Sequence, residues 1–134
     1  MKKGRLSRKK ILAAAVQVMD RDGLKTLSMR RLGVELGVEA MSLYRYVANK
    51  SALLDGIFET ILGELKAPVG SGDWRTDVRH TARQFRAVLE AHPNAVLLFA
   101  TRPAVTPASL DFVEASLAIL IDAGFSPHNA MTAF

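Results

Sequence analysis

One run of side chains in this 134-residue chain combines aromatic rings, hydroxyl groups and an arginine, and it covers residues 40–46. Leu43 and Val47 stand four residues apart, so in a helix both would face the protein interior. A helix face of hydroxyls and arginine suits contact with phosphates and base edges. The run therefore predicts the second helix of a helix-turn-helix, which lies in the major groove of DNA. The outward-facing residues would be Met41, Ser42, Tyr44, Arg45 and Tyr46.

A preceding helix must hold this run in place, and Ser28 is its expected N-cap. Leu32, Leu36 and Val38 are spaced to pack the first helix on the second. Gly37 stands where the chain leaves the first helix with a positive φ, which only glycine adopts cheaply. This stretch is therefore expected to form two short helices joined by a tight turn.

Two kinds of DNA contact are expected from this region. Contacts to bases read the sequence, whereas contacts to phosphates fix the register of the protein on the duplex. Tyr44 could instead pack under its own helix. The expected base-facing residues are Ala40, Met41, Ser42, Arg45 and Tyr46, the expected phosphate-facing residues are Thr26, Ser28, Tyr44 and Lys50, and Arg30 could reach either.

The positive charge of the chain is concentrated in its first part. Residues 1–50 hold 12 Lys and Arg against 4 Asp and Glu, a net charge of +8, whereas residues 51–134 hold 6 against 9, a net charge of −3. This asymmetry indicates a polyanionic partner for the first part alone. Lys2, Lys3 and Arg5 could follow the DNA backbone or minor groove, or be mobile.

Two more helices are expected on either side of the helix-turn-helix. Ser7 is the N-cap of a helix that Gly23 ends, and Asn49 is the N-cap of a connecting helix. Apolar positions cover a wide face of the connecting helix, so we expect it to be buried on more than one side. The apolar faces are Ile11, Ala15, Val18 and Met19 in the first of these helices, and Leu53, Leu54, Ile57, Phe58, Ile61, Leu62 and Leu65 in the second.

Residues 67–72 are the best linker in the chain, and helices are expected on its far side. One begins near Asp73 and stops at Pro93, a short apolar helix covers residues 94–102, and another begins at Thr106 and ends at Gly124. The expected inward faces are Trp74, Val78, Ala82, Phe85, Leu89 and His92, and then Leu110, Val113, Leu117, Leu120 and Ile121.

The predicted fold class is all-α, since no segment shows the alternation of a strand. We predict a DNA-binding domain over residues 1–50, a connecting helix over 51–66 and a helical domain over 67–134. A last helix begins at Ser126, but the chain stops at Phe134, about two turns later. We therefore expect a fragment of a longer protein with an incomplete second domain.

The first part resembles the tetracycline-repressor (TetR) family of transcriptional regulators. The resemblance covers roughly residues 7–58 and lies in Leu36-Gly37-Val38, in the run from Leu43 to Val47, and in residues 49–54. It implies an N-terminal three-helix domain with a helix-turn-helix, and a repressor released from an inverted-repeat operator by a small-molecule effector. Gly33 is a departure, because the family usually has alanine there, and glycine weakens a helix by about 1 kcal/mol.

The second part resembles the helical effector-binding and dimerisation domain of tetracycline-binding members. The resemblance lies in Asp73-Trp74, Phe85-Arg86, Thr101-Arg102-Pro103, Val113-Glu114 and residues 123–126. It implies a homodimer in the full-length form, with Thr101-Arg102-Pro103 as the part that moves on effector binding. The effector-binding residues it implies are Lys66, Thr81, Phe85, Leu89, Leu98, Thr101, Arg102, Val113, Ser116 and Leu117.

Leu98 departs from that pattern, since it falls at or near the position of the family's magnesium-binding histidine. Lys66 falls at a second drug-contacting histidine. Leucine offers no oxygen or nitrogen ligand to a metal. We therefore predict that the chain does not bind magnesium–tetracycline with the affinity of the family, while another apolar effector stays plausible. These pocket residues could also be core residues only.

Catalytic and metal-binding patterns are not evident in the sequence. His80, His92 and His128 lack the spacing of a zinc-binding helix, and surface positions are expected for them. Neither a phosphate-binding glycine loop nor a nucleophile elbow is present, so we predict a protein that is not an enzyme and uses no metal or cofactor. No apolar run reaches membrane-spanning length, and a cytoplasmic location is expected.

Three functions are compatible with this sequence. The first is a ligand-responsive repressor that binds double-stranded DNA and a small molecule. The second is a helical small-molecule carrier or enzyme whose basic face is incidental, and salt-independent or absent DNA binding would favour it. The third is an interaction or dominant-negative fragment that keeps the DNA-binding part without the later dimer helices.

Overall fold

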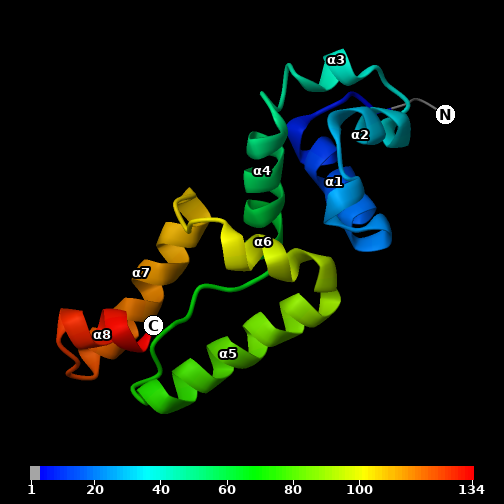
Figure 1. Cartoon of the computed structure of the whole chain (residues 1–134). Helices are drawn as coiled ribbons and strands as arrows, with labels where there is room; N and C mark the ends of the chain where they lie inside the picture. Colours follow the sequence, from blue (N-terminus) through cyan, green and yellow to red (C-terminus); the bar gives the residue numbers. More distant parts are fainter. Residues whose placement is uncertain (1–3) are drawn as a thin grey trace. The chain divides into compact units, whose positions relative to one another are not determined.

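The computed structural model describes residues 4–134, so Lys2 and Lys3 lie outside the described residues. All regular structure in the described part is helical, which confirms the all-α prediction (Figure 1). The α-helices are α1 (Arg8–Asp22), α2 (Met29–Leu36), α3 (Ala40–Leu43), α4 (Lys50–Leu62), α5 (Trp74–Ala91), α6 (Val96–Thr101), α7 (Pro107–Asp122) and α8 (Pro127–Ala133), and short 3₁₀ turns lie at η1 (Leu24–Thr26) and η2 (Pro93–Ala95).

The chain divides into two compact units that are not continuous in sequence. The first contains residues up to 61 together with residues 92–102, and the second contains residues 62–91 and 103–134. The boundaries expected at residues 50 and 66 do not coincide with this division. The main difference is that η2 and α6, which follow the linker in sequence, are part of the first unit.

The first unit is capped and packed as the sequence predicts. The Ser7 hydroxyl accepts a hydrogen bond from the Lys10 amide at 3.2 Å, and Asn49 Oδ1 accepts one from the Ala52 amide at 2.8 Å. The apolar face expected for α1 is buried, and so is that of α4 apart from Leu54, which is half-buried. Ala95 and Leu98 are buried as well, and the rings of Phe58 and Phe99 lie 4.6 Å apart between centroids. The core of this unit therefore includes residues from η2 and α6.

The second unit contains α5, α7 and α8. The Trp74 and Phe125 rings pack edge to face with centroids 5.0 Å apart, and Arg75 lies 4.5 Å above the Trp74 ring. The Ser126 hydroxyl accepts a hydrogen bond from the Asn129 amide at 3.1 Å and so caps α8. Within the described residues, no helix is long and apolar enough to cross a membrane.

The inward faces expected for α5 and α7 are partly wrong. Val78, Leu110 and Ile121 are 43%, 53% and 43% exposed. On α5 the buried residues are Asp77 and Val88. The Asp77 carboxylate accepts a hydrogen bond from the Ser71 amide at 3.0 Å, so the buried side of α5 includes a satisfied carboxylate and differs from the purely apolar stripe. On α7 the buried residues are Ser109, Ile119 and Leu120.

Candidate nucleic-acid interface

The turn between α2 and α3 has the geometry that the sequence predicts. The Ser28 hydroxyl accepts a hydrogen bond from the Arg31 amide at 3.0 Å and caps α2. Gly37 adopts a left-handed conformation with φ 66° and ψ 34°, and its amide donates to the Val34 carbonyl at 3.2 Å. Only glycine adopts this conformation without strain. The chain can therefore reverse between the two helices within a few residues.

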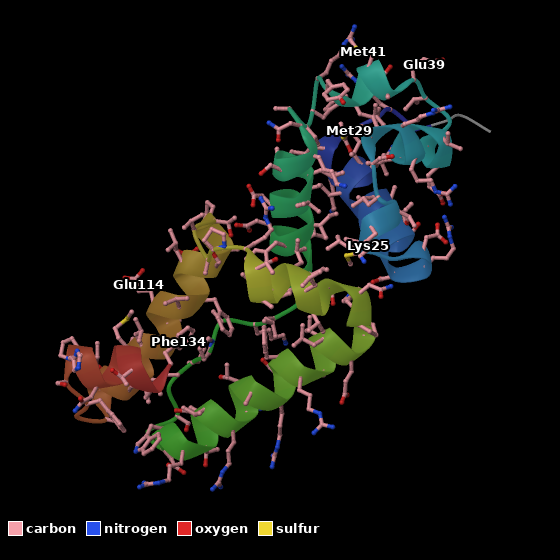
Figure 2. The ribbon with its side chains drawn as sticks, in the orientation of Figure 1. Lys25, Met29, Glu39, Met41, Glu114 and Phe134 are labelled. Atoms are coloured by element: carbon pink, nitrogen blue, oxygen red, sulfur yellow. The ribbon has the colours of Figure 1, made fainter. Side chains whose placement is uncertain are left out.

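The helix α3 and the turn that follows it present Met41, Tyr44, Arg45 and Tyr46 outward. Leu43 and Val47 are buried at 0% and 3% exposure, whereas Met41 is 76% exposed. Figure 2 shows Met41 at the outer edge of the unit, beside Glu39. Regular α-helix ends at Leu43, and hydrogen bonds from the amides of residues 46 and 47 to the Leu43 carbonyl carry the chain onward as a turn. The predicted inward positions are confirmed, and so are the predicted outward positions apart from Ser42, which is half-buried.

Tyr44 and Tyr46 lie at the surface rather than under the helix. Their side chains are 45% and 36% exposed, and Arg45 is exposed between them. Ser42 and Ala40 are half-buried. An open depression with a volume of about 420 Å³ lies on this face, and its lining is formed by Met41, Ser42, Tyr44 and Arg45. The outward face therefore combines a hollow, an apolar side chain and a cation.

The hydroxyl groups of Thr26 and Ser28, near the start of α2, differ in whether their proton is available for a hydrogen bond to DNA. Ser28 uses a lone pair to cap the helix, so its proton stays available for an oxygen outside the protein. Thr26 donates its hydroxyl proton to the Gly23 carbonyl at 2.9 Å, or to the Asp22 carbonyl at 3.2 Å. A phosphate contact from Thr26 would require that proton to turn outward. Ser28 is thus the better placed of the two.

A cluster of ion pairs joins α1 to α2, and it was not predicted from the sequence. Asp22 Oδ2 lies 2.7 Å from Arg31 and 3.2 Å from Arg21, and Arg21 lies 2.9 Å from Glu35. Hydrogen bonds from Arg21 and then Arg31 hold the pKa of Asp22 below its usual value, and Arg21 does the same to the pKa of Glu35. Arg31 is therefore engaged within the protein, while Arg30 is exposed.

The segment from His92 to Arg102 is fastened to the first unit at both ends. His92 Nδ1 lies 2.7 Å from Asp20 Oδ2, and the Asn94 side-chain amide donates to the Met19 carbonyl at 2.9 Å. His92 is buried, so the surface position expected for it is wrong, whereas its expected place on an inward face is confirmed. At the other end, Arg102 donates to Asp55 at 2.8 Å. No local sequence pattern signals these contacts, because their partners lie far away along the chain.

The residues implied as effector-binding are distributed over both units. Leu98, Thr101 and Arg102 lie in the first unit, where Leu98 is 1% exposed and Thr101 donates to the Leu97 carbonyl at 2.7 Å. The others lie in the second unit, where Lys66 is exposed and the remainder are half-buried. These half-buried residues are Thr81, Phe85, Leu89, Val113, Ser116 and Leu117.

Both parts of the chain match a known family. Residues 11–57 match the bacterial regulatory proteins of the tetR family, and residues 68–134 match the tetracyclin repressor-like C-terminal domain. The chain therefore belongs to the tetR family of bacterial regulatory proteins.

Relatives and solved structures agree with this assignment. An HTH-type transcriptional regulator from Saccharopolyspora erythraea is 40% identical over 129 residues, covering 96% of this chain and 55% of the relative. The class E tetracycline repressor protein of Escherichia coli is 34% identical, covering 95% and 61%. The chain thus spans roughly three-fifths or less of the length of these two relatives.

Among solved structures, the Streptomyces coelicolor TetR family protein ActR in complex with actinorhodin has a TM-score of 0.90 and 30% identity. The match covers 96% of this chain and 61% of ActR. BioQ with its double-stranded DNA operator has a TM-score of 0.83 and 28% identity, covering 96% and 79%.

Proposed function

We propose that this chain is the DNA-reading and effector-sensing part of a transcriptional repressor. The observation that carries the proposal is the outward face of α3, where Met41, Tyr44 and Arg45 surround an open depression beside a tight Gly37 turn. These side chains are exposed on a unit whose net charge is strongly positive, as expected for a surface that meets a polyanion. The solved BioQ structure, which contains a DNA operator, supports the same reading.

The partners follow from this role. Double-stranded DNA with an inverted repeat is the expected target, because a two-fold symmetric pair of heads binds two half-sites. We infer that the full-length form is a homodimer that acts in the cytoplasm, and that its task is binding and not catalysis. The residues proposed to contact bases are Ala40, Met41, Ser42, Arg45 and Tyr46, and those proposed to contact phosphates are Thr26, Ser28, Arg30, Tyr44 and Lys50.

The proposed effector is a small molecule with an apolar surface that binds without magnesium. Phe85, Leu89, Val113 and Leu117 are half-buried apolar residues that we propose as the apolar contacts of this effector, and Thr81 and Ser116 would add hydroxyl groups. Two similar proteins support a small-molecule effector. One is named a tetracycline repressor, and the solved structure of the other, ActR, contains actinorhodin. Leu98 cannot ligate a metal, which argues against a magnesium-bound drug.

The proposed signal passes through Arg102. This residue ends α6 and bonds to Asp55 in α4, the helix that follows the helix-turn-helix. An effector that alters the end of α6 would alter this bond. The orientation of α4, and with it the position of α3 on DNA, would then change.

Selection of bound sequences from a random duplex library at moderate salt tests the proposal. An enriched inverted repeat is expected if the chain dimerises, and a single enriched half-site if it does not. Arg45→Ala serves as the control, since loss of a base contact should reduce enrichment while non-specific binding remains. Salt-sensitive binding without any enrichment would reject sequence reading, and salt-independent or absent binding would favour a carrier.

A further inference from the structure

The outward side of α5 carries a row of arginines. From the first of them, the others follow four, eight and eleven residues later, so helix geometry places all four within about 80° of one another around the axis. The row is about 16 Å long, since each residue advances a helix by about 1.5 Å. Figure 2 shows nitrogen-tipped side chains along one side of α5. This arginine row consists of Arg75, Arg79, Arg83 and Arg86, and all four residues are exposed.

The overall charge of the second unit conceals this row. Residues 62–91 and 103–134 hold five Lys and Arg against seven Asp and Glu, a net charge of −2. Four of the five cations belong to the arginine row, whereas α7 holds three acids and no cation. Positive and negative charges are therefore separated onto different helices of the same unit.

The two arginines in the middle of the row have no bonded partner in the part of the chain that the structure describes. Neither Arg79 nor Arg83 forms a hydrogen bond or an ion pair there. Arg75 lies over the preceding tryptophan ring, and Arg86 donates to Glu90 at 2.8 Å. The side chains of that last pair are 81% and 63% exposed, so it holds Arg86 only weakly. The row is therefore open to a partner from outside.

Solvation alone explains this arrangement poorly. The surface of a solvated helix commonly carries opposite charges four residues apart, which stabilise the helix, whereas like charges at that spacing destabilise it. Arg75, Arg79 and Arg83 follow one another at that unfavourable spacing. The row therefore weakens α5 in the free protein, and an anionic partner would offset the repulsion.

We propose that the arginine row binds the phosphate backbone of double-stranded DNA, independently of sequence and in addition to the helix-turn-helix. A guanidinium group offers a planar fork of donors that fits the oxygens of a phosphate. Each DNA strand carries one negative charge per about 3.4 Å of its axis, so a row of about 16 Å faces about five phosphates. The charge and the length of the row therefore match this partner.

Two other anionic partners fit the row less well. A helix that binds an anionic membrane carries large apolar or aromatic side chains beside its basic residues. The exposed residues that flank this row are instead Thr76, Val78, Ala82 and Ala87. The choice of DNA over an acidic protein rests on the proposed function, because a duplex held by the first unit has a high effective concentration at the second.

The salt dependence of binding to a random-sequence duplex tests the proposal. The variant Arg79→Gln/Arg83→Gln removes both unbonded charges and keeps residues that favour a helix. Each phosphate contact contributes about 0.9 to the slope of log affinity against log salt, so we expect the slope to fall by about two. The ranking of sequences obtained by selection should stay the same, since the helix-turn-helix is unaltered. Anisotropy of a labelled duplex at several salt concentrations gives the slope.

Two matched variants separate phosphate contact from net charge. Arg79→Lys/Arg83→Lys keeps both charges on α5 and should keep the slope of the wild type. Asp111→Asn/Asp122→Asn changes the net charge of the second unit by the same amount in the opposite direction, away from α5, and should leave the slope unchanged. The urea midpoint of the glutamine variant should equal or exceed that of the wild type, because it loses no bonded contact and less repulsion remains.

Three results would overturn the role of the arginine row. The first is an unchanged slope in the glutamine variant, and loss of binding to phosphatidylglycerol vesicles beside it would assign the row to a membrane instead. The second is a slope that rises in the asparagine variant as much as it falls in the glutamine variant, since DNA would then respond to net charge alone. The third is a glutamine variant that does not fold, which would show that these arginines serve the fold.

Failure of the proposed function would look different. A wild-type chain that enriches no sequence would contradict sequence reading by the helix-turn-helix. The salt slope on random duplex, and its fall in the glutamine variant, do not depend on that enrichment. Each proposal can therefore fail while the other stands.

Discussion

Arg102 and Asp55 are separated by 47 residues in sequence, yet Arg102 Nε donates a hydrogen bond to Asp55 Oδ1 at 2.8 Å. The Arg102 Nη2 atom lies 2.6 Å from the same oxygen and also donates to the Ser51 carbonyl at 3.1 Å. Arg102 ends α6, whereas Ser51 and Asp55 lie near the start of α4. One guanidinium group therefore joins the end of one helix to the beginning of another.

Replacing Arg102 with alanine should loosen this joint. We expect Arg102→Ala to lower the free energy of unfolding by about 1–2 kcal/mol, because the pair is charge-assisted but only partly shielded from water. Amide hydrogen exchange should quicken in α6 and in the first turn of α4. The control is Arg86→Ala, since Arg86 and Glu90 form a pair with 81% and 63% exposed side chains. Urea titration of both variants checks the prediction, and equal losses would count against it.

Arg45 and Lys50 should differ in what they contribute to DNA binding. Arg45→Ala is expected to relax base preference, at a cost of about 1–3 kcal/mol if Arg45 makes a bidentate base contact. Lys50→Ala should weaken binding to all sequences alike and lower the salt slope by about one. Affinities on cognate and random duplexes at several salt concentrations decide the matter. Equal losses on both duplexes for Arg45→Ala would refute its base-reading role.

Arg30 and Arg31 are neighbours in α2 with different expected roles. Arg31 is bonded to Asp22 at 2.7 Å, so Arg31→Ala should reduce folding stability more than DNA affinity. Arg30 is exposed, so Arg30→Ala should reduce DNA affinity and leave stability within about 0.5 kcal/mol of the wild type. Each variant serves as the control for the other, in urea titrations and in DNA titrations. The reverse pattern would show that the two arginines exchange these roles.

The ion-pair cluster predicts a dependence of stability on acid. The pKa values of Asp22 and Glu35 are lowered from ordinary values of 3.8 and 4.5, chiefly by hydrogen bonds from Arg21. A carboxylate with a lowered folded pKa stabilises the fold above its ordinary pKa, and this contribution disappears as the pH falls through the folded pKa. Urea midpoints of the wild type and Arg21→Ala should therefore differ near neutral pH and converge in acid. A constant difference down to strongly acidic pH would contradict this.

Tetracycline offers a direct test of the magnesium prediction. Leu98 is 1% exposed and carries no metal-binding atom, so the drug should not bind tightly through magnesium. The fluorescence of Trp74 reports on the titration, which is carried out with magnesium and again with a chelator. We expect the same weak response in both. Tight quenching that requires magnesium would show the prediction to be wrong.

The helix-turn-helix could be predicted because its signals are local. Gly37 indicates a left-handed residue, and the spacing of Leu43 and Val47 indicates the buried side of the next turns, and both are found. The buried face of α5 could not be predicted in the same way. This face includes Asp77, whose carboxylate accepts a hydrogen bond from the Ser71 amide, and a hydropathy pattern assigns a carboxylate to the surface.

The attachment of η2 and α6 to the first unit could not be predicted from the sequence either. It depends on His92, Asn94 and Arg102, and their partners are 47 to 75 residues away. A pair at such a separation leaves no periodic trace in either segment. The partners of polar residues that bond across the fold therefore cannot be predicted from local sequence patterns.

The contribution of residues 92–102 to the first unit bears on how such regulators can be recombined. The chain passes from one unit to the other at residues 61–62, 91–92 and 102–103. An exchange of DNA-reading heads between relatives at the 67–72 linker would separate Phe58 from Phe99, and the head would meet the recipient's residues in place of Ala95 and Leu98. A chimera that keeps the native fold must therefore transfer two separate stretches of sequence together. The first unit is compact in space, but the residues that form it are not contiguous in the sequence.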